Sequence, residues 1–168
     1  MPPDLTRTVQ SQPGSEPRLD ERRLRELFDR TFQFIGLLSP DGTLLEINRT
    51  ALDLIGASRE DVVGLPFWDT PFWRTAEDRD RLRAGVAAAA AGEFVRYETE
   101  HEAAGGGTIV VDLSLKPVRG EDGRVELIIP EGRDITDAKR AEEALRISEA
   151  KLPLRFRQST LYLQRCFH

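Results

Sequence analysis

The spacing of apolar residues changes from a strand pattern to a helical pattern near the end of the chain. Val125 to Ile129 is mostly apolar and rich in β-branched residues without helical spacing, which predicts a strand. Thr136 to Lys151 holds no Gly or Pro and consists almost entirely of fair to good helix formers, which predicts a helix. Asp134 or Thr136 can accept hydrogen bonds from the first free amides of that helix. We therefore expect a last strand that passes directly into a capped helix leaving the domain.

Strand patterns also occur in two runs further upstream. The expected strands are residues 34–38, 43–47, 94–100, 108–116 and 124–133. In the third, charged residues alternate with uncharged ones, the period of a half-buried strand. Ser39-Pro40-Asp41-Gly42 and Gly105-Gly106-Gly107 are typical of the turns between antiparallel strands. Pro130 predicts a bulge or a strand end, because proline has no N–H to donate to a neighbouring strand.

A helix is expected before the first strand, from Leu19 or Asp20 onward. It carries the apolar side chains of Leu24, Leu27, Phe28 and Phe32 on one face. That face either packs on the chain's own sheet or pairs with a second copy in a dimer, and the sequence favours neither.

Helices are also expected between the two runs of strands. One is capped by Asn48 and closed by Gly56, one begins at Ser58, and a longer one runs from Thr75 to Ala91. Two runs of strands around a helical block predict an α+β fold, an antiparallel five-stranded sheet with helices on one face. Additional helices flank it at both ends.

Composition excludes several function classes. The chain has 168 residues, long enough for one domain with a real core, and its 39% hydrophobic content is ordinary. The net charge of −5 argues against a general nucleic-acid binder. We find no apolar stretch long enough for a signal peptide or a membrane span, which predicts a cytoplasmic location.

Candidate chemistry is sparse. His101 falls at the end of a strand beside the glycine loop, and we expect it to be solvent-exposed and structural. Cys166, the single cysteine, and His168 lie close together without the further ligands that a metal site requires. The glycine loop precedes a strand rather than a helix, so it is not a phosphate loop. With no candidate nucleophile or acid/base pair, the sequence predicts a protein without catalytic activity.

Several segments, in order, resemble those of PAS domains, the small sensor modules of bacterial signalling proteins. The first is the exit segment, Gly132-Arg133-Asp134-Ile135-Thr136, followed by a helix rich in Lys, Arg, Glu and Ala. The others are Leu37 to Leu44, Arg59 to Gly64, Pro66-Phe67-Trp68 and Ser114 to Val118. The resemblance covers roughly residues 27 to 151 and is specific for the fold rather than for a ligand.

The resemblance implies a domain organisation. It comprises a disordered leader (1–18), an N-terminal flanking helix (19–33), a PAS sensor domain (34–134), a C-terminal signalling helix (135–152) and a tail (153–168) of unknown structure. Such modules belong to sensor histidine kinases or cyclic-dinucleotide enzymes, so we expect an output domain after the helix. None follows here, where Pro153 interrupts the helical pattern.

The same resemblance limits the set of cofactors that we expect. Light-sensing relatives attach flavin through a cysteine in the helical region, and residues 48–91 contain none. Haem-binding relatives use a histidine in the long helix, and residues 75–91 contain none. Cysteinyl-flavin and histidine-ligated haem are therefore not expected. Non-covalent flavin stacked on Phe67, Trp68 or Trp73 stays open, as does the alternative that these rings are simply core.

Three groups of residues are candidates for function. A pocket between the sheet and the helices would be lined by Asn48, Leu52, Phe67, Trp68 and Trp73. Asp134, Ile135 and Thr136 would couple the sheet to the exit helix. Leu24 and Phe28 in the first helix, with Ala141 and Leu145 in the last, would form a homodimer interface.

We therefore expect a dimeric PAS module that senses a small molecule or a partner and relays the change through its last helix. The alternative of another class is a ligand-free dimerisation module with a fully packed interior.

Overall fold

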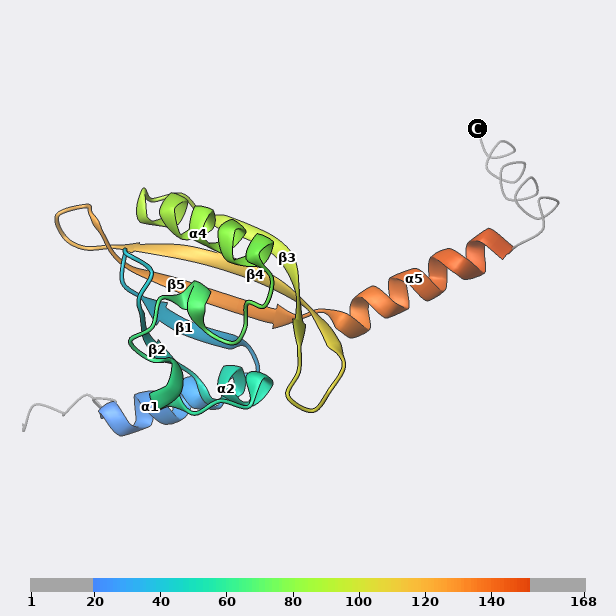
Figure 1. The fold of residues 1–168 in the computed structure, drawn as a ribbon, viewed down its shortest axis with the longest axis horizontal. Coiled ribbons are helices and arrows are strands. Elements are labelled where there is room, and N and C mark those ends of the chain that lie inside the picture. Colours follow the sequence, from blue (N-terminus) through green and yellow to red (C-terminus); the bar gives the residue numbers. More distant parts are fainter. Residues whose placement is uncertain (1–19, 152–168) are drawn as a thin grey trace, which may run out of the picture.

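The structure, a computed structural model, describes residues 20–151 and consists of an antiparallel sheet with helices on one face (Figure 1). The strands are β1 (Phe34–Leu38), β2 (Leu44–Ile47), β3 (Val95–Glu102), β4 (Thr108–Arg119) and β5 (Val125–Asp134). The helices are α1 (Glu21–Asp29), α2 (Arg49–Ile55), α3 (Arg59–Val62), the 3-10 turn η1 (Phe67–Asp69), α4 (Ala76–Ala90) and α5 (Thr136–Lys151). The expected α+β fold is confirmed. The expected leader and the expected tail, which holds Cys166 and His168, lie outside the described residues, as does Leu152, the last residue of the expected C-terminal helix.

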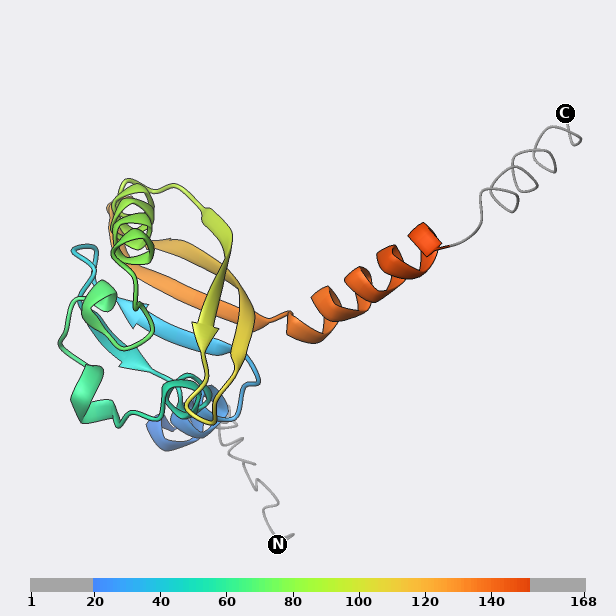
Figure 2. The same ribbon diagram turned by 45° about the vertical axis from the view of Figure 1, so that its right-hand side comes forward.

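The five strands are arranged in the order β2-β1-β5-β4-β3, so β5 is the central strand and β2 and β3 are the edges. All pairings are antiparallel. Figure 2 shows α4 across the strands on one face, and α5 projecting away from the sheet at the end of β5. The last strand thus leads out of the domain from its centre.

Local sequence signals account for the helix boundaries. Thr75 accepts a hydrogen bond from the amide of Asp78 at the start of α4 (3.0 Å). Ser58 and Asp61 form a reciprocal capping box at the start of α3. Gly56, with φ of 66°, ends α2 in the left-handed conformation that glycine adopts without steric cost.

Pro130 corrects one expectation. β5 continues past it to Asp134, and the register with β4 is unbroken from Val111 to Val118, so the predicted bulge or strand end is wrong. A Cβ atom on Gly36, in the neighbouring strand β1, would lie 3.2 Å from Pro130 Cγ. The absence of a side chain at Gly36 therefore leaves room for the proline ring inside a central strand.

The core fills the space between the sheet and the helices. Its buried apolar residues are Leu38, Leu44, Ile47, Ala51, Leu52, Val62, Phe67, Phe72, Trp73, Leu82, Val86, Ala89, Leu113, Leu115 and Ile128. The aromatic stretch between α3 and α4 thus supplies much of the packing. Each fully buried large apolar side chain contributes about 1.5–3 kcal/mol to folding.

His101 corrects a second expectation, because it is only 5% exposed. It lies in β3 on the same face as Thr99, which is also buried. Its Nδ1 lies 2.9 Å from the carbonyl oxygen of Phe72, and since a carbonyl only accepts, Nδ1 carries the proton. Burial lowers the pKa of His101, opposed by the hydrogen bond to Phe72 and the charge of Asp78. His101 is therefore a neutral core residue at neutral pH.

Asn48 fastens the N-terminal segment to the domain. Its fully buried side chain accepts hydrogen bonds from the amides of Ile35 (3.1 Å) and Ala51 (3.2 Å). Its side-chain nitrogen Nδ2 donates to Thr31 Oγ1 (2.9 Å) and to the carbonyl oxygens of Phe28 (3.3 Å) and Gln33 (2.8 Å). One side chain therefore caps α2 and fixes the loop after α1.

Ion pairs complete the attachment of α1, which buries no residue of its own. Arg25 pairs with Glu46 of β2 (2.7 Å), and Arg59 of α3 pairs with both Glu46 (3.2 Å) and Asp29 (3.2 Å). Desolvation by burial is the largest single effect on the pKa of Glu46 and raises it. The hydrogen bond from Arg25 and the nearby positive charges outweigh it, so the pKa of Glu46 is lowered. α1 is thus positioned by polar contacts.

Replacing Asn48 by Ala should lower the free energy of unfolding by about 2–4 kcal/mol, because it removes a cap and leaves buried backbone groups without partners. Thr75→Ala, which removes one exposed cap bond, is the matched control and should cost about 1 kcal/mol. Urea unfolding measures both. Equal losses for the two variants would contradict the clamp assigned to Asn48.

Stability should decrease as the pH falls from about 7 to about 5, in part through His101. The unfolded chain binds the proton with an ordinary pKa, whereas burial holds the folded-state pKa lower. The unfolded state therefore binds more protons in this range. Urea unfolding at several pH values should show a shallower dependence of stability on pH in His101→Phe than in the parent chain. If the unfolding free energy of His101→Phe depended on pH as steeply as that of the parent chain, this role of His101 would be refuted.

Candidate functional site

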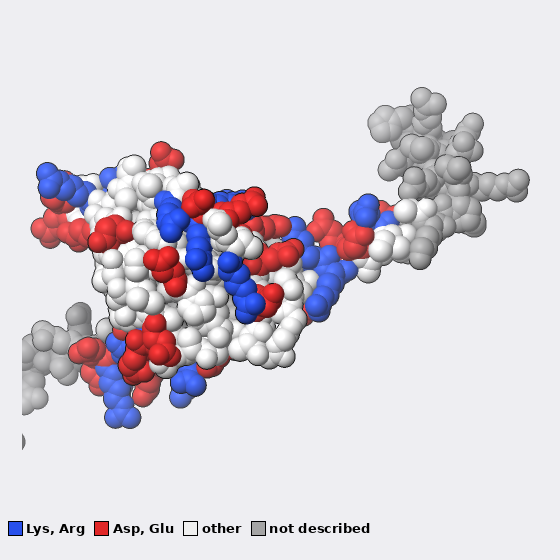
Figure 3. Space-filling model, viewed as in Figure 1, with Lys and Arg blue, Asp and Glu red and all other residues white. Residues whose placement is uncertain are grey.

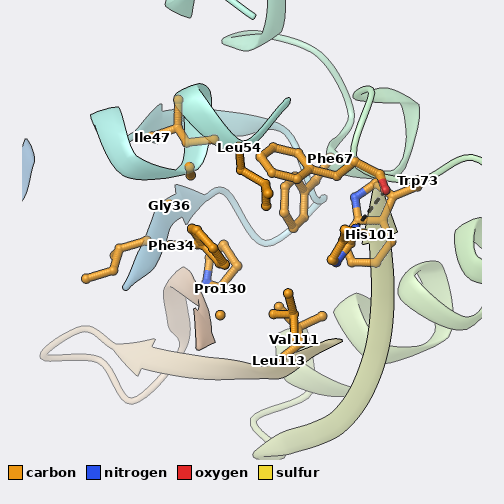
Figure 4. Close-up of a pocket in the computed structure, with 14 residues that line it drawn as sticks. Phe34, Gly36, Ile47, Leu54, Phe67, Trp73, His101, Val111, Leu113 and Pro130 are labelled. Atoms are coloured by element: carbon orange, nitrogen blue, oxygen red, sulfur yellow. Dashed lines mark hydrogen bonds between the residues drawn. The ribbon is translucent and has the colours of Figure 1, made fainter. Parts of the chain in front are cut away.

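A pocket lies between the sheet and the helical layer, at the place where the sequence predicts one (Figure 4). Strands β1, β4 and β5 supply one wall, α2 another, and the aromatic stretch before α4 a third. The lining residues are Phe34, Ile35, Gly36, Ile47, Ala51, Leu54, Phe67, Phe72, Trp73, His101, Val111, Leu113, Pro130 and Gly132. Except for His101 and the indole N–H of Trp73, their side chains offer no polar group.

The pocket has a volume of about 30 Å³. That is room for one or two water molecules, whereas sites for drug-sized ligands measure about 300–1,000 Å³. Gly36 and Gly132 contribute to the pocket walls, and a Cβ atom on Gly132 would lie 2.9 Å from Val111. In this arrangement the pocket therefore fits only a small molecule.

Aromatic rings meet edge to face on one side of the pocket. Trp73 contacts Phe67 at 5.4 Å and 85° between ring planes, and His101 at 5.0 Å and 73°. Phe72 contacts Phe67 and His101, each at 6.0 Å. Such contacts contribute about 0.5–1.5 kcal/mol each beyond the area they bury. They fix the positions of the only two pocket residues with polar ring atoms.

Trp73 is the chemically distinctive residue of the pocket. It is 2% exposed, and its Nε1 is buried without a hydrogen-bond partner. Leaving such a donor unpaired costs about 1–3 kcal/mol.

The structure brings only some of the predicted pocket residues together. Phe67 and Trp73 line the pocket, whereas Asn48, Leu52 and Trp68 do not. Asn48 is committed to the clamp described above, and Leu52 is 5% exposed in the core. Trp68 lies beside Gly42 and under the guanidinium of Arg83 (5.5 Å), so the two tryptophans do not face a common space.

His101 and the β4 residues of the pocket were not anticipated. A signal for His101 was present, since it continues the alternation that places Val95 and Thr99 on one face of β3. Val111 and Leu113 follow the same rule in β4. What the sequence does not reveal is that the loop carrying Phe72 returns to meet the end of β3.

The pocket does not fit the larger cofactors of PAS domains. Its volume is far below what a flavin ring system requires, and Trp68 is not available to stack on one. Among the described residues no cluster of three or more His, Cys, Asp or Glu side chains could hold a metal ion. The described helices also include none with the length and apolar content needed to cross a membrane.

The junction between β5 and α5 is the second candidate site. Thr136 is 9% exposed, and its hydroxyl accepts from the amide of Val110 in β4 (2.9 Å) and donates to Asp134 (2.5 Å). Asp134 also accepts from the Thr136 amide (2.9 Å). Ile135 donates to the carbonyl of Val110 (2.9 Å). All three predicted coupling residues therefore take part in one hydrogen-bonded connection.

Beyond this connection, Lys139 pairs with Glu98 of β3 (2.8 Å), and that hydrogen bond raises the pKa of Lys139. From Arg140 to Ala150 the side chains of α5 are exposed, with Leu145 at 61%. In α1, Leu24 is 51% exposed and Phe28 is half-buried. The residues predicted for the dimer helices are thus largely accessible.

Comparison with known proteins gives consistent relationships. A family model described as the PAS fold matches residues 28–140. The chain is 41% identical over 124 residues to the hybrid signal transduction histidine kinase D of Dictyostelium discoideum, covering 72% of this chain. It is 38% identical over 138 residues to the sensor histidine kinase TmoS of Ectopseudomonas mendocina, covering 79% of this chain. It spans only 8% and 14% of those two proteins.

The PAS domain of an HTR-like protein from Haloarcula marismortui superimposes on this structure with a TM-score of 0.53. That domain is 26% identical, and the match covers 68% of this chain and 90% of the other. Sequence, family model and three-dimensional structure therefore agree, and this chain belongs to the PAS family of sensory modules in signal-transduction proteins.

Proposed function

We propose that this chain is the non-catalytic sensory module of a larger cytoplasmic signalling protein, a sensor histidine kinase. This chain spans only 8% and 14% of the length of the two histidine kinases it resembles, which supports a larger protein in which a transmitter follows α5. Residues 34–134 act as the sensor, with residues 19–33 and 135–152 as flanking helices. Charges of both signs are interspersed on the face in Figure 3, which supports a module that does not bind nucleic acid.

One observation carries the proposed mechanism. The start of α5 is held by Thr136, whose hydroxyl is bonded both to β4 and to Asp134. Val110 is one residue from Val111, which lines the pocket. A change in pocket packing that moves β4 therefore acts directly on the first turn of α5, and the signal is a shift between two positions of that helix.

We also propose that the module works as a homodimer. Leu24 and Leu27 on α1 and Leu145 and Ile147 on α5 are all more than 40% exposed. Two apolar residues on each helix, beside charged ones, favour pairing with a second copy. A helix such as α5, which is exposed for most of its length, gains stability from a partner.

The ligand-free dimerisation module remains the second candidate, and the small volume of the pocket favours it. The unpaired indole N–H of Trp73 favours the sensor instead, because a fully packed interior has no use for an unsatisfied donor. We therefore place the sensor first.

Asp134→Ala should alter signalling in a chimaera that joins this chain, through residue 151, to the transmitter of a histidine kinase. Losing the acceptor of Thr136 weakens the link between β5 and α5, so the basal autophosphorylation rate should change about 2- to 30-fold. Asp137→Ala is the matched control, because Asp137 is exposed and its ion pair, among the described residues, is with Arg140 of the same helix. An Asp134→Ala chimaera with the parental rate would remove this residue from the mechanism.

Leu24→Glu and Leu145→Glu should each weaken the dimer about 10- to 100-fold, since each places a charge where an apolar side chain is buried between copies. Sedimentation equilibrium of the full chain measures the dissociation constants. Arg22→Ala, on the exposed charged side of α1, should leave them unchanged. If both glutamate variants dimerise like the parent, the interface lies elsewhere.

A further inference from the structure

The two edges of the sheet differ in what their outward backbone groups contact. At β2, the amide of Leu44 donates to the carbonyl of Leu65 (2.9 Å), and the carbonyl of Leu44 accepts from Gly64 (2.8 Å). The loop after α3 therefore closes this edge. At β3, the yellow-green strand at the other edge in Figure 2, the described residues supply one such bond, from Arg81 Nη1 to the carbonyl of Glu98 (3.4 Å). An edge left open in this way can pair with a further strand.

The backbone groups of alternate β3 residues point away from the sheet. Val110 of β4 accepts from the amide of Ile135, so its backbone groups face β5. Its two neighbours in β4 therefore face β3, where Thr99 and His101 stand opposite them. The β3 residues between and beside these two turn their N–H and C=O groups to the open edge. They are Glu98, Glu100 and Glu102.

A groove of about 490 Å³ runs along this edge. Residues 98–102 of β3 line it without a break. Because successive side chains of a strand point to opposite faces, a groove meets every residue of such a run only along the edge of the strand. The start of α4 forms the opposite wall, with Thr75, Glu77 and Asp78. An extended segment lying in the groove would therefore contact both the backbone of β3 and the first turn of α4.

The groove carries an excess of negative charge. Its carboxylates outnumber its two guanidinium groups, those of Arg74 and Arg81. Glu102 pairs with Arg74, and Glu98 pairs with Lys139 of α5. Glu100 stands between these pairs, and none of the ion pairs among the described residues involves it. The carboxylates that line the groove are Glu77, Asp78, Glu98, Glu100 and Glu102. The groove therefore attracts a segment with positive side chains and repels an acidic one.

A second copy of this chain does not fit the open edge. Antiparallel pairing of two β3 strands over the groove would place Glu100 opposite another glutamate, which is Glu98, Glu100 or Glu102 according to the register. Like charges directly opposite one another destabilise a strand pair. The acidic edge thus opposes self-pairing and favours a partner of opposite charge.

We propose that the β3 edge binds an extended basic segment of a partner protein as an additional antiparallel strand. Alternate lysine or arginine residues of that segment lie opposite Glu98, Glu100 and Glu102, and their backbone groups pair with those of the three glutamates. Antiparallel pairing continues the arrangement of the sheet and is the more stable one per residue. This surface adds a partner-binding function to the relay tested by the Asp134→Ala chimaera and does not depend on that relay.

A short alternating peptide tests strand addition. Ac-Val-Lys-Val-Lys-Val-Lys-Val-NH2 is titrated into the ¹⁵N-labelled full chain while backbone amide resonances are followed by NMR. The amides of Glu98, Glu100 and Glu102 should shift saturably and exchange more slowly with heavy water, because they gain acceptors. Those of Thr99 and His101, which face β4, should exchange as before. A peptide that does not bind, or that binds without protecting the three glutamate amides, would overturn the proposal.

Two N-methylated peptides separate backbone pairing from attraction between charges, because both keep every charge. A methyl group on the amide of the central lysine removes a hydrogen bond to β3 and should weaken binding about 2- to 12-fold. A methyl group on the amide of a neighbouring valine, which faces away from β3, should leave the affinity unchanged. Equal affinities of the two methylated peptides would overturn strand addition, and a loss with the valine peptide alone would overturn the antiparallel orientation.

Glu100→Gln tests the contribution of charge. It should weaken binding of the lysine peptide about 1.4- to 5-fold, the effect of one exposed ion pair. Glu121→Gln makes the same change in the exposed turn after β4 and is the matched control, with an unchanged affinity. A peptide with glutamate in place of lysine should not bind. Binding of that peptide, or equal affinities of the two variants, would overturn the basic partner.

The same spectra test the second copy as an occupant. Without peptide, the amide resonances of Glu98, Glu100 and Glu102 should not change with the concentration of the chain. A saturable, concentration-dependent shift of these amides would show that β3 pairs with itself and would overturn the proposal.

Discussion

The central position of β5 constrains everything else in this domain. β5 pairs with β1 on one side and β4 on the other, and its last residues continue directly into α5. Because both neighbours fix its register, β5 cannot shift without displacing the sheet. The direction of α5 is therefore set by the same hydrogen bonds that hold the sheet together. The extra tie from Thr136 to Val110 makes β4 a second determinant of where the helix begins.

The two flanking helices are attached by different means that have a common consequence. α1 is held by the Asn48 clamp and by the ion pairs of Arg25 and Arg59, and α5 by Thr136 and Lys139. In both helices apolar side chains stay exposed while polar groups make the attachment. Polar contacts of this kind are directional, so they fix the orientation of each helix. α1 is held through a fully buried joint at Asn48, whereas α5 is joined to the sheet through Thr136 and Lys139 in its first turn.

Sequence patterns predicted the elements well because strand alternation, turn glycines and helix caps are local. They were poor guides wherever distant segments had to be brought together. The clamp at Asn48 depends on three oxygen atoms from the end of α1 and the loop after it, 15 to 20 residues away. Pro130 fits into a central strand only because Gly36 lies opposite, and His101 is buried because the Phe72 loop covers it. None of these relations has a signature in the residues nearest to it.

The distribution of satisfied and unsatisfied polar groups distinguishes the joint at Asn48 from the core around Trp73. Asn48 is fully buried and uses both its oxygen and its amide nitrogen in hydrogen bonds, which is what a fixed structural joint requires. Trp73 is almost as deeply buried, yet its N–H has no partner. The packing around it is too extensive for this to be a loose region, since rings of Phe67 and His101 contact it edge to face. A donor held rigidly and left unpaired costs about 1–3 kcal/mol of folding free energy, which distinguishes the core around Trp73 from the fully bonded joint at Asn48.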